Sequence, residues 1–231
     1  MSEYTDSGGR IILVPTPIGN LGDITLRAIE VLKSADRIAC EDTRRSGILL
    51  SHHSITGKPL VALHEHNEIR KSPELVAAAK AGEIIAFISD AGMPGISDPG
   101  YRLVQACLEA DVPFDVLPGP SAVLTALIGS GLPCHAFRYG GFLSVKSGKR
   151  KTAMTAALES GETGIFFESP HRIVSTLEIL VEIAPTANVC VARELTKKFE
   201  TYHRGNPAEL LEWFKTHGTK GEMVILMNAA R

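Results

Sequence analysis

Short runs of apolar residues alternate along the chain with longer segments in which apolar residues recur at helical spacing. Each run has the length of a strand and is rich in Ile, Val or Phe, which is typical of strands buried in a sheet. The expected strands are residues 11–14, 37–40, 84–88, 114–117, 164–167, 189–192 and 223–227. Strands that alternate with helices predict an α/β fold.

Four residue pairs have the pattern of a helix start. A Ser, Asp or Asn side chain accepts hydrogen bonds from the free N–H groups at a helix N-terminus, and the fixed φ of proline suits the first turn. The pairs are Ser72-Pro73, Asp98-Pro99, Ser169-Pro170 and Asn206-Pro207.

The proline-rich turn at residues 117–121 is the expected boundary between domains. We expect two α/β domains, residues 1–118 and 119–231. A second segment, residues 140–151, has the Ser and Gly content of a loop, although Phe142 and Leu143 make it more than a simple linker.

Composition excludes several classes of protein. The net charge of −2 argues against a protein that coats nucleic acid, although basic residues outnumber acidic ones after residue 120. No apolar run reaches the 18 residues of a membrane span, and the first ten residues lack a signal-peptide core. The four cysteines are widely spaced, which favours reduced thiols in a cytoplasmic protein over a metal site or disulfides.

Loops rich in Gly and Pro follow three of the expected strand positions, at residues 15–23, 89–100 and 118–122. Glycine allows close approach of the backbone to a ligand and proline rigidifies the loop, which suits a small polar cofactor. Tight connections between strands and helices would have the same composition. The chain has no G-x-G-x-x-G after the first strand, no P-loop, no H-E-x-x-H and no G-x-S-x-G. These residues alone therefore indicate an α/β enzyme with an unusual cofactor loop, and no metal.

Nine motifs identify a family. They are residues 15–21, 41–44, 64–68, 89–92, 97–100, 118–122, 167–172, 192–197 and 221–224. In this order they resemble the small subunit ribosomal RNA methyltransferase I family, a branch of the tetrapyrrole methylase superfamily. The resemblance extends from Ile11 to Met227.

The resemblance implies two α/β domains of the class III methyltransferase type, with S-adenosylmethionine in the cleft between them. It also implies 2′-O-methylation of cytidine 1402 in the decoding centre of 16S rRNA, with S-adenosylhomocysteine as the product. The partners would be the 30S subunit and, in a homodimer, a second copy of the chain; no membrane partner and no metal is expected.

By the same resemblance, cofactor contacts are expected at eleven residues. They are Pro17, Asp90, Ala91, Gly92, Met93, Ile96, Ser121, Ala122, Phe167, Ala192 and Met223. The carboxylate of Asp90 would favour the cationic sulfonium electrostatically. Ile96, Phe167 and Met223 could flank the adenine or the methionine chain, and ordinary core packing is the alternative for these three.

Transfer to a ribose hydroxyl depends on positioning, and a general base can assist it. Glu41 and Asp42 are the candidate catalytic carboxylates, since they end a strand beside two arginines. A structural ion pair is the alternative.

RNA binding needs positive charge and contacts to unstacked bases. The candidates are Arg44, Arg45, His64, His66, Lys146, Lys149, Arg150, Lys151, Arg193, Lys197 and Lys198. A solvated charged face is the alternative for the segment 146–151.

Departures from the family pattern leave methyl transfer as the expected activity and affect the details expected of RNA docking. Ser144 stands where the family commonly has proline, Phe167 replaces a common tyrosine and Met93 a common threonine, and many relatives continue past the last strand. Two alternatives stay open: a methyltransferase of the same superfamily that acts on a tetrapyrrole or a protein side chain, and a non-catalytic RNA-binding protein.

Overall fold

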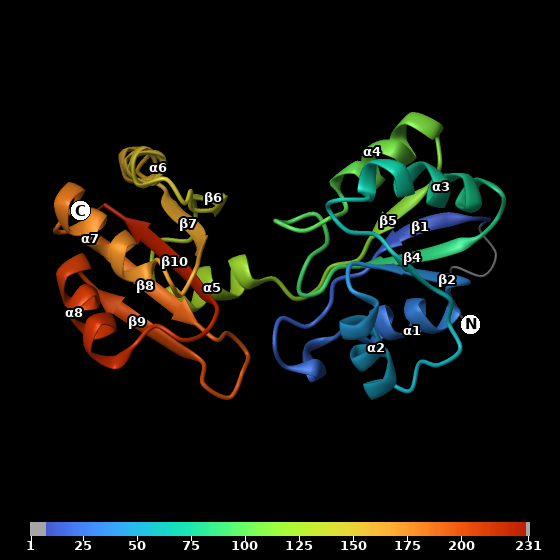
Figure 1. Ribbon diagram of the computed structural model, residues 1–231, viewed down its shortest axis with the longest axis horizontal. Helices are drawn as coiled ribbons and strands as arrows, with labels where there is room; N and C mark the ends of the chain where they lie inside the picture. Colours follow the sequence, from blue (N-terminus) through green and yellow to red (C-terminus); the bar gives the residue numbers. More distant parts are fainter. Residues whose placement is uncertain (1–7, 230–231) are drawn as a thin grey trace. The chain divides into compact units, whose positions relative to one another are not determined.

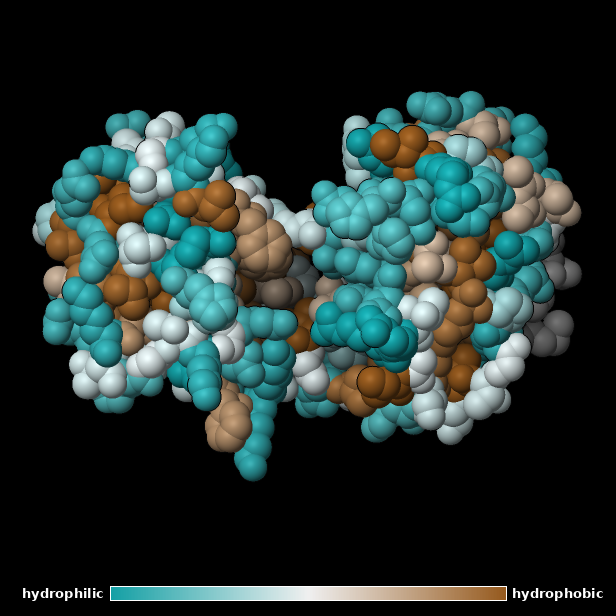
Figure 2. Space-filling view, in the orientation of Figure 1, coloured by the Kyte–Doolittle hydropathy of each residue, from teal (hydrophilic) through white to brown (hydrophobic). Residues whose placement is uncertain are grey.

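The computed structural model describes residues 8–229, and the chain divides into two compact units, Met1–Ser121 (unit 1) and Ala122–Arg231 (unit 2). Each unit contains a five-stranded sheet covered by helices, so the α/β fold class is confirmed (Figure 1). Hydrophilic side chains cover much of the visible surface of both units, with apolar patches between them (Figure 2). Among residues 8–229, no helix is both long and apolar enough to cross a lipid bilayer.

Unit 1 contains a parallel sheet in the strand order β3-β2-β4-β1-β5. Its strands are β1 (Arg10–Leu13), β2 (Arg37–Cys40), β3 (Leu60–Ala62), β4 (Ile84–Ile88) and β5 (Phe114–Val116). Its helices are η1 (Leu21–Asp23), α1 (Leu26–Ser34), α2 (Thr43–His52), α3 (Glu68–Lys80) and α4 (Tyr101–Ala110). Because all strands run the same way, their carboxyl ends lie at one edge of the sheet.

Helices cover both faces of this sheet (Figure 1). Ile12, Ile38 and Ala86 pack against buried side chains of α1 and α2. Ile11 and Phe87 point the other way, toward α3 and α4. Burial on both faces explains why these strands are continuous apolar runs.

Unit 2 contains a mixed sheet in the order β6-β7-β10-β8-β9, in which only β6 and β7 are parallel. Its strands are β6 (Phe137–Phe142), β7 (Thr163–Glu168), β8 (Asn188–Arg193), β9 (Thr201–Gly205) and β10 (Met223–Asn228). Its helices are α5 (Ala122–Ser130), α6 (Ser147–Glu159), α7 (Ile173–Ile183) and α8 (Pro207–His217).

The two faces of the unit 2 sheet are covered differently. Helices α6, α7 and α8 pack on the face that carries Phe166, Val191 and Ile225. Helix α5 lies on the opposite face, where the Tyr202 hydroxyl donates to the Thr125 carbonyl at 3.4 Å. Gly129 is required there, because a Cβ atom would lie 2.3 Å from the Tyr202 ring.

All seven predicted strands are confirmed as β1, β2, β4, β5, β7, β8 and β10, with bounds that agree to within a residue or two. The sequence interpretation missed β3, β6 and β9, which are all edge strands. An edge strand is only partly buried and need not be a continuous apolar run, as the Tyr-His-Arg of β9 illustrates.

One of the four predicted helix starts is confirmed. Asn206 caps α8 and forms a capping box with Glu209. Pro73 instead lies inside α3, which begins at Glu68, so the predicted start at Ser72 is wrong. The starts at Asp98 and Ser169 are also wrong, because α4 and α7 begin at Tyr101 and Ile173 after a tighter turn in each case.

The cysteines are free thiols in the structure. Cys40, Cys107 and Cys190 are buried and Cys134 is exposed. Burial raises the pKa of Cys107 and of Cys190 to about 11, so these thiols stay protonated at neutral pH.

Candidate active site

The loops that follow β1, β2 and β4 meet at the carboxyl edge of the unit 1 sheet. Cys40 pairs with Ile88, which places the residues that follow β2 and β4 side by side. The backbone of Thr16 exchanges two hydrogen bonds with Gly92, at 3.0 and 2.9 Å, and the Thr16 hydroxyl donates to the Ser89 carbonyl at 3.2 Å. These bonds tie the loop after β1 to the loop after β4.

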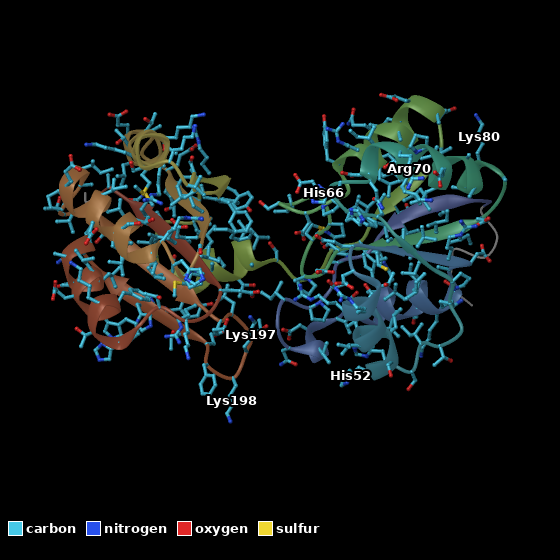
Figure 3. The ribbon with its side chains drawn as sticks, in the orientation of Figure 1. His52, His66, Arg70, Lys80, Lys197 and Lys198 are labelled. Atoms are coloured by element: carbon cyan, nitrogen blue, oxygen red, sulfur yellow. The ribbon has the colours of Figure 1, made fainter. Side chains whose placement is uncertain are left out.

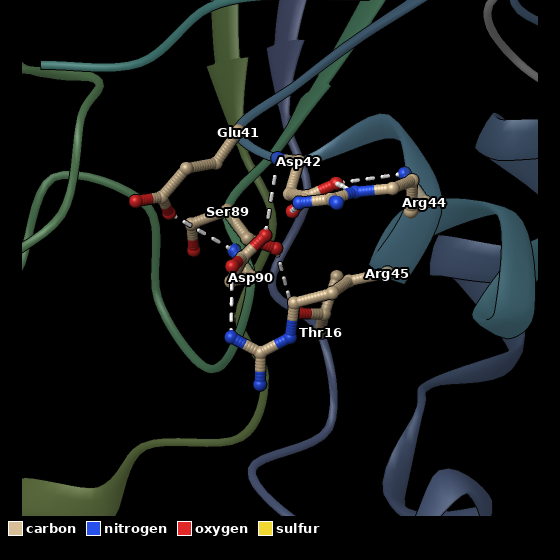
Figure 4. A network of polar contacts seen from close by, with 7 residues as sticks. All are labelled: Thr16, Glu41, Asp42, Arg44, Arg45, Ser89 and Asp90. Atoms are coloured by element: carbon tan, nitrogen blue, oxygen red, sulfur yellow. Dashed lines mark hydrogen bonds and ion pairs between the residues drawn. The ribbon is translucent and has the colours of Figure 1, made fainter. Parts of the chain in front are cut away.

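Asp90 is the centre of a polar network at this edge (Figure 4). Its Oδ1 accepts a hydrogen bond from the Asp42 backbone N–H at 3.1 Å, and its Oδ2 accepts from Arg45 Nη1 at 2.8 Å. Its own backbone N–H donates to Glu41 Oε2 at 3.2 Å. The fold therefore brings together the two predicted catalytic residues, Glu41 and Asp42, and the predicted cofactor residue Asp90.

Asp42 has a structural role in this arrangement. It is the N-cap of α2, where Oδ1 accepts from the Arg44 backbone N–H at 2.8 Å, and Oδ2 pairs with Arg44 Nη2 at 2.7 Å. The hydrogen bonds from the Arg44 side chain and backbone hold the pKa of Asp42 well below its usual range. A carboxylate that binds protons so weakly is a poor general base at neutral pH.

Glu41 differs from Asp42 in the direction of its pKa shift. Burial raises the pKa of Glu41, while the hydrogen bond from the Asp90 N–H opposes the rise, and the negative charge of Asp90 adds to it. The side chain has one hydrogen bond in the described structure, on Oε2. Of the two predicted catalytic carboxylates, Glu41 is thus the one suited to accept a proton.

Asp98 is a further carboxyl at this edge, and the sequence interpretation assigned it to a helix cap. Burial raises the pKa of Asp98 to about 6, and the negative charge of Glu41 contributes to the rise, whereas the Ser89 hydroxyl opposes it. Glu41 and Asp98 are thus two neighbouring carboxyls whose pKa values are both raised by burial. The pattern Ser97-Asp98-Pro99-Gly100 could have indicated a functional role for Asp98, but helix capping explained the same pattern equally well.

The motif at residues 64–68 divides into structural and exposed members. Asn67 accepts from the His64 N–H at 2.9 Å and donates to the Ala62 carbonyl at 3.1 Å, which fixes the turn. Glu68 is buried and accepts from the N–H groups of Gly100, at 2.7 Å, and Arg102, at 3.1 Å. It thereby caps α4 in place of the predicted Asp98.

The two histidines of the same turn remain available for contacts. The His64 and His66 rings meet edge to face with centroids 6.0 Å apart, and His66 is exposed (Figure 3). Both follow β3 at the carboxyl edge of the unit 1 sheet, and the charge of His64 acts on Glu41.

The other cofactor candidates of unit 1 surround the junction of the two loops. Pro17 and Gly92 are buried, Met93 is half-buried, and Ala91 and Ile96 are exposed. Gly92 has a φ of 80°, and a Cβ atom there would lie 3.2 Å from Ile18 Cγ2. Both the backbone conformation and the space at this point therefore favour glycine. Ser121 is the last residue of unit 1.

Three of the four cofactor candidates of unit 2 lie on neighbouring strands, and the fourth begins a helix. Phe167 and Ala192 both pair with Val224, so they share one level and one face of the sheet. Met223 points to the opposite face, where it is buried in the core with α6, α7 and α8. A cofactor on the Phe167 face would meet the backbone near Met223 rather than its side chain. Ala122 is the first residue of α5.

The predicted RNA-binding residues fall into two groups by their partners. Arg44 pairs with Asp42, Arg45 with Asp90, Lys197 with Glu194 and Glu222, and Lys151 with Glu182. Lys146, Lys149 and Lys198 are exposed, and no ion pair involves them within residues 8–229. Lys197 and Lys198 lie in the connection between β8 and β9 (Figure 3), and Arg193 ends β8 half-buried.

Two predictions for the segment 140–151 need correction. The segment is not a loop, because β6 ends at Phe142 and α6 begins at Ser147. Arg150 faces inward on α6, is only 4% exposed, and donates to Ser175 Oγ at 3.1 Å. Its side chain packs the helix and is not accessible to phosphate in this structure.

Within residues 8–229 no group of three or more His, Cys, Asp or Glu side chains is placed to hold a metal ion.

Known proteins resemble this chain along nearly its whole length. The model of the tetrapyrrole (corrin/porphyrin) methylases matches residues 10–211. A protein of Hydrogenobaculum sp. (strain Y04AAS1) named ribosomal RNA small subunit methyltransferase I is 46% identical over 222 residues, covering 95% of both chains. The protein of that name from Escherichia coli O157:H7 is 48% identical over 225 residues, covering 96% of this chain and 78% of its own.

A solved structure shares the fold at low sequence identity. Uroporphyrin-III C-methyltransferase from Thermus thermophilus, complexed with S-adenyl homocysteine, superposes with a TM-score of 0.66 at 19% identity, covering 95% of this chain and 97% of its own.

Proposed function

The chain belongs to the family of tetrapyrrole (corrin/porphyrin) methylases, and we propose that it transfers a methyl group from S-adenosylmethionine to the ribose 2′-hydroxyl of cytidine 1402 in 16S rRNA. The observation that carries this proposal is the identity of 46% and 48%, along nearly the whole chain, to proteins named ribosomal RNA small subunit methyltransferase I. The family resemblance inferred from the nine motifs is confirmed, and the chain is a methyltransferase.

The residues at the carboxyl edge of unit 1 fit S-adenosylmethionine as the methyl donor. The cofactor supplies an electrophilic methyl group on a sulfonium cation. Asp90 and Glu41 provide negative charge that favours a cation, and the left-handed conformation of Gly92 lets the loop after β4 turn close to the loop after β1. A neighbouring fold with bound S-adenyl homocysteine supports the same cofactor.

In the proposed reaction Glu41 accepts the proton of the ribose 2′-hydroxyl while the oxygen forms its new bond to the methyl carbon. The methyl–sulfur bond breaks, and the sulfur retains the electron pair. The Asp90 N–H holds Glu41 Oε2, which leaves Oε1 to receive the proton. Asp90 pairs with Arg45 at 2.8 Å and holds Glu41 through its backbone N–H, so Asp90 acts by position and charge while Glu41 accepts the proton.

We extend the proposal to the surroundings of the reaction. The assembled 30S subunit is the substrate, the exposed lysines and the two histidines of the candidate set bind its RNA, and the chain acts in the cytoplasm as a homodimer. The expected partner is thus a polyanion, for which salt-sensitive binding is the physical signature.

The test uses labelled S-adenosylmethionine, purified 30S subunits that lack the modification, and mapping of the product by nuclease digestion and mass spectrometry. The expected product is a single 2′-O-methylcytidine in the decoding region. Cofactor binding by calorimetry, together with no transfer to 30S subunits, would refute the RNA assignment and favour a tetrapyrrole or a protein side chain as acceptor. Sedimentation of the same preparation tests the homodimer.

A further inference from the structure

Strand β6 ends in a bulge that re-aims an aromatic side chain. Tyr139 pairs with Ile165, but the register then shifts, so that Phe142 lies opposite Phe167. Gly141 has a φ of 70°, and a Cβ atom on Gly140 would lie 2.2 Å from the Phe166 ring. Bulges of this kind bend an edge strand and redirect the side chain that follows.

The redirected Phe142 is held from one side and open on the other. Its ring meets Phe167 edge to face, with centroids 5.3 Å apart, and Tyr139 contacts Phe167 in the same way at 5.2 Å. Phe142 nevertheless remains 62% exposed, and Val145 nearby is 74% exposed. The structure thus fixes an aromatic ring at the surface without burying it.

Two lysines without an ion pair in the described structure follow Phe142 in the chain. Lys146 and Lys149 are exposed, and neither forms an ion pair within the described part of the chain, whereas Lys151 is paired with Glu182 at 2.6 Å. Lys146 is the N-cap of α6 and contributes no side-chain cap, so the first N–H groups of α6 add their partial positive charge at the same place. Ser144 Oγ accepts from the Lys146 N–H at 3.3 Å and shapes the connecting turn.

A fixed, exposed aromatic ring that is followed within one short turn by unpaired lysines combines the two features by which proteins hold single-stranded nucleic acid. We propose that Phe142 is a stacking platform for an unpaired base of the RNA substrate, and that Lys146 and Lys149 bind the phosphates next to that base. This inference rests on the proposed function and names the part of unit 2 that holds the RNA. The charge distinguishes the surface from an apolar contact with another protein, which would exclude unpaired lysines from its centre.

The first test compares Phe142→Ala, Phe142→Leu and Phe142→Trp in methylation of 30S subunits. Loss of one base–aromatic stack is expected to raise KM for the subunits about 5- to 150-fold in the Ala variant. The Leu variant retains apolar area but lacks a π face, and it should resemble Ala, whereas Trp should stay within about twofold of the wild type. Val145→Ala is the matched control, because it removes exposed apolar surface from the same segment without removing a ring.

Binding of S-adenosylmethionine, measured by calorimetry on the same variants, separates this role from the cofactor site. Unchanged cofactor affinity with a raised KM for subunits supports the inference. Weaker cofactor binding in Phe142→Ala, full activity of that variant, full activity of Phe142→Leu, or a changed sedimentation coefficient would each overturn it. If the wild type transfers no methyl group to 30S subunits, the proposed function itself fails, which is a distinguishable result.

The second test concerns the phosphates. For single-stranded RNA, the logarithm of the binding constant falls with the logarithm of the salt concentration by about 0.7 per neutralised phosphate. Lys146→Gln with Lys149→Gln is therefore expected to reduce this slope by about 1.4 in filter binding to 30S subunits that lack the modification. Lys33→Gln with Lys80→Gln, on helices of unit 1, is the control of equal charge. An equal slope change in both pairs would refute a local phosphate site.

Discussion

Replacing Glu41 by glutamine tests which carboxylate accepts the proton. The glutamine side chain would keep an oxygen to receive the Asp90 N–H, which now lies 3.2 Å from Glu41 Oε2, so the loop geometry should survive. What the substitution removes is the ability to bind a proton. We therefore expect a loss of turnover with little change in the affinity for S-adenosylmethionine.

The size of the loss follows from the role of the residue. General base catalysis contributes about 10²- to 10⁴-fold, which corresponds to about 3 to 5 kcal/mol of barrier. Asp42→Asn is the matched control, since Asn is an equally good N-cap for α2 and the pKa of Asp42 lies too low for a base. Its turnover should fall less than about tenfold.

The assay is single-turnover methyl transfer to 30S subunits as a function of pH, with the cofactor-bound enzyme in excess over the subunits. A base must be ionised, so the wild-type rate should rise with pH through the pKa of Glu41, which burial has raised. Full turnover of Glu41→Gln, or a greater loss in Asp42→Asn, would refute the assignment.

Three further predictions concern stability. The pKa of Asp98 rises from 3.8 to about 6 on folding, so the ionised carboxylate destabilises the folded state above that pH. Asp98→Asn should therefore raise the free energy of unfolding near pH 8 by at most about 3 kcal/mol, and by less where water reaches the carboxyl. Near pH 4 it should change this free energy little, and urea denaturation at both pH values measures the difference. Glu168→Ala removes a fully buried carboxylate that pairs with Arg172 at 2.7 Å and accepts from the buried Thr176 hydroxyl, and it should cost about 3 to 5 kcal/mol. The exposed Glu178→Ala should cost under about 1 kcal/mol, and equal shifts of the urea midpoint would contradict the role of burial. Asn206→Ala removes the cap of α8 and should cost about 1 kcal/mol in thermal or urea unfolding, and Asn206→Ser should restore most of it.

The sequence alone determined the parts of the fold that depend on local pattern. Central strands are buried on both faces, and this burial requires the continuous apolar runs from which β1, β2 and β4 were predicted. The cap of α8 was predictable because Asn206 acts on its own neighbours in the chain. The family followed from motifs that are contiguous in the sequence and therefore need no fold to be recognised.

The roles of individual charged side chains depend on contacts between residues that are distant in the sequence. Glu41 and Asp42 are adjacent in the sequence, but the fold buries Glu41, which raises its pKa, whereas the hydrogen bonds from Arg44 lower the pKa of Asp42. Asp98 was assigned to a cap that Glu68, thirty residues earlier, in fact provides. A pKa depends on burial and on neighbours in space, and neither is a property of the local sequence.

Exposure of the basic and aromatic residues between β6 and α6 was likewise a tertiary outcome. Lys149 and Arg150 are neighbours in one charged run, yet the helix turns the first outward and the second into the core. Phenylalanine is a residue type common in protein cores, but the bulge at two glycines leaves Phe142 at the surface. The direction of a side chain depends on the geometry of the strand or helix that carries it. A partly exposed edge strand, or a strand with a bulge, has only a weak hydrophobic pattern, so its sequence does not specify which face each side chain takes.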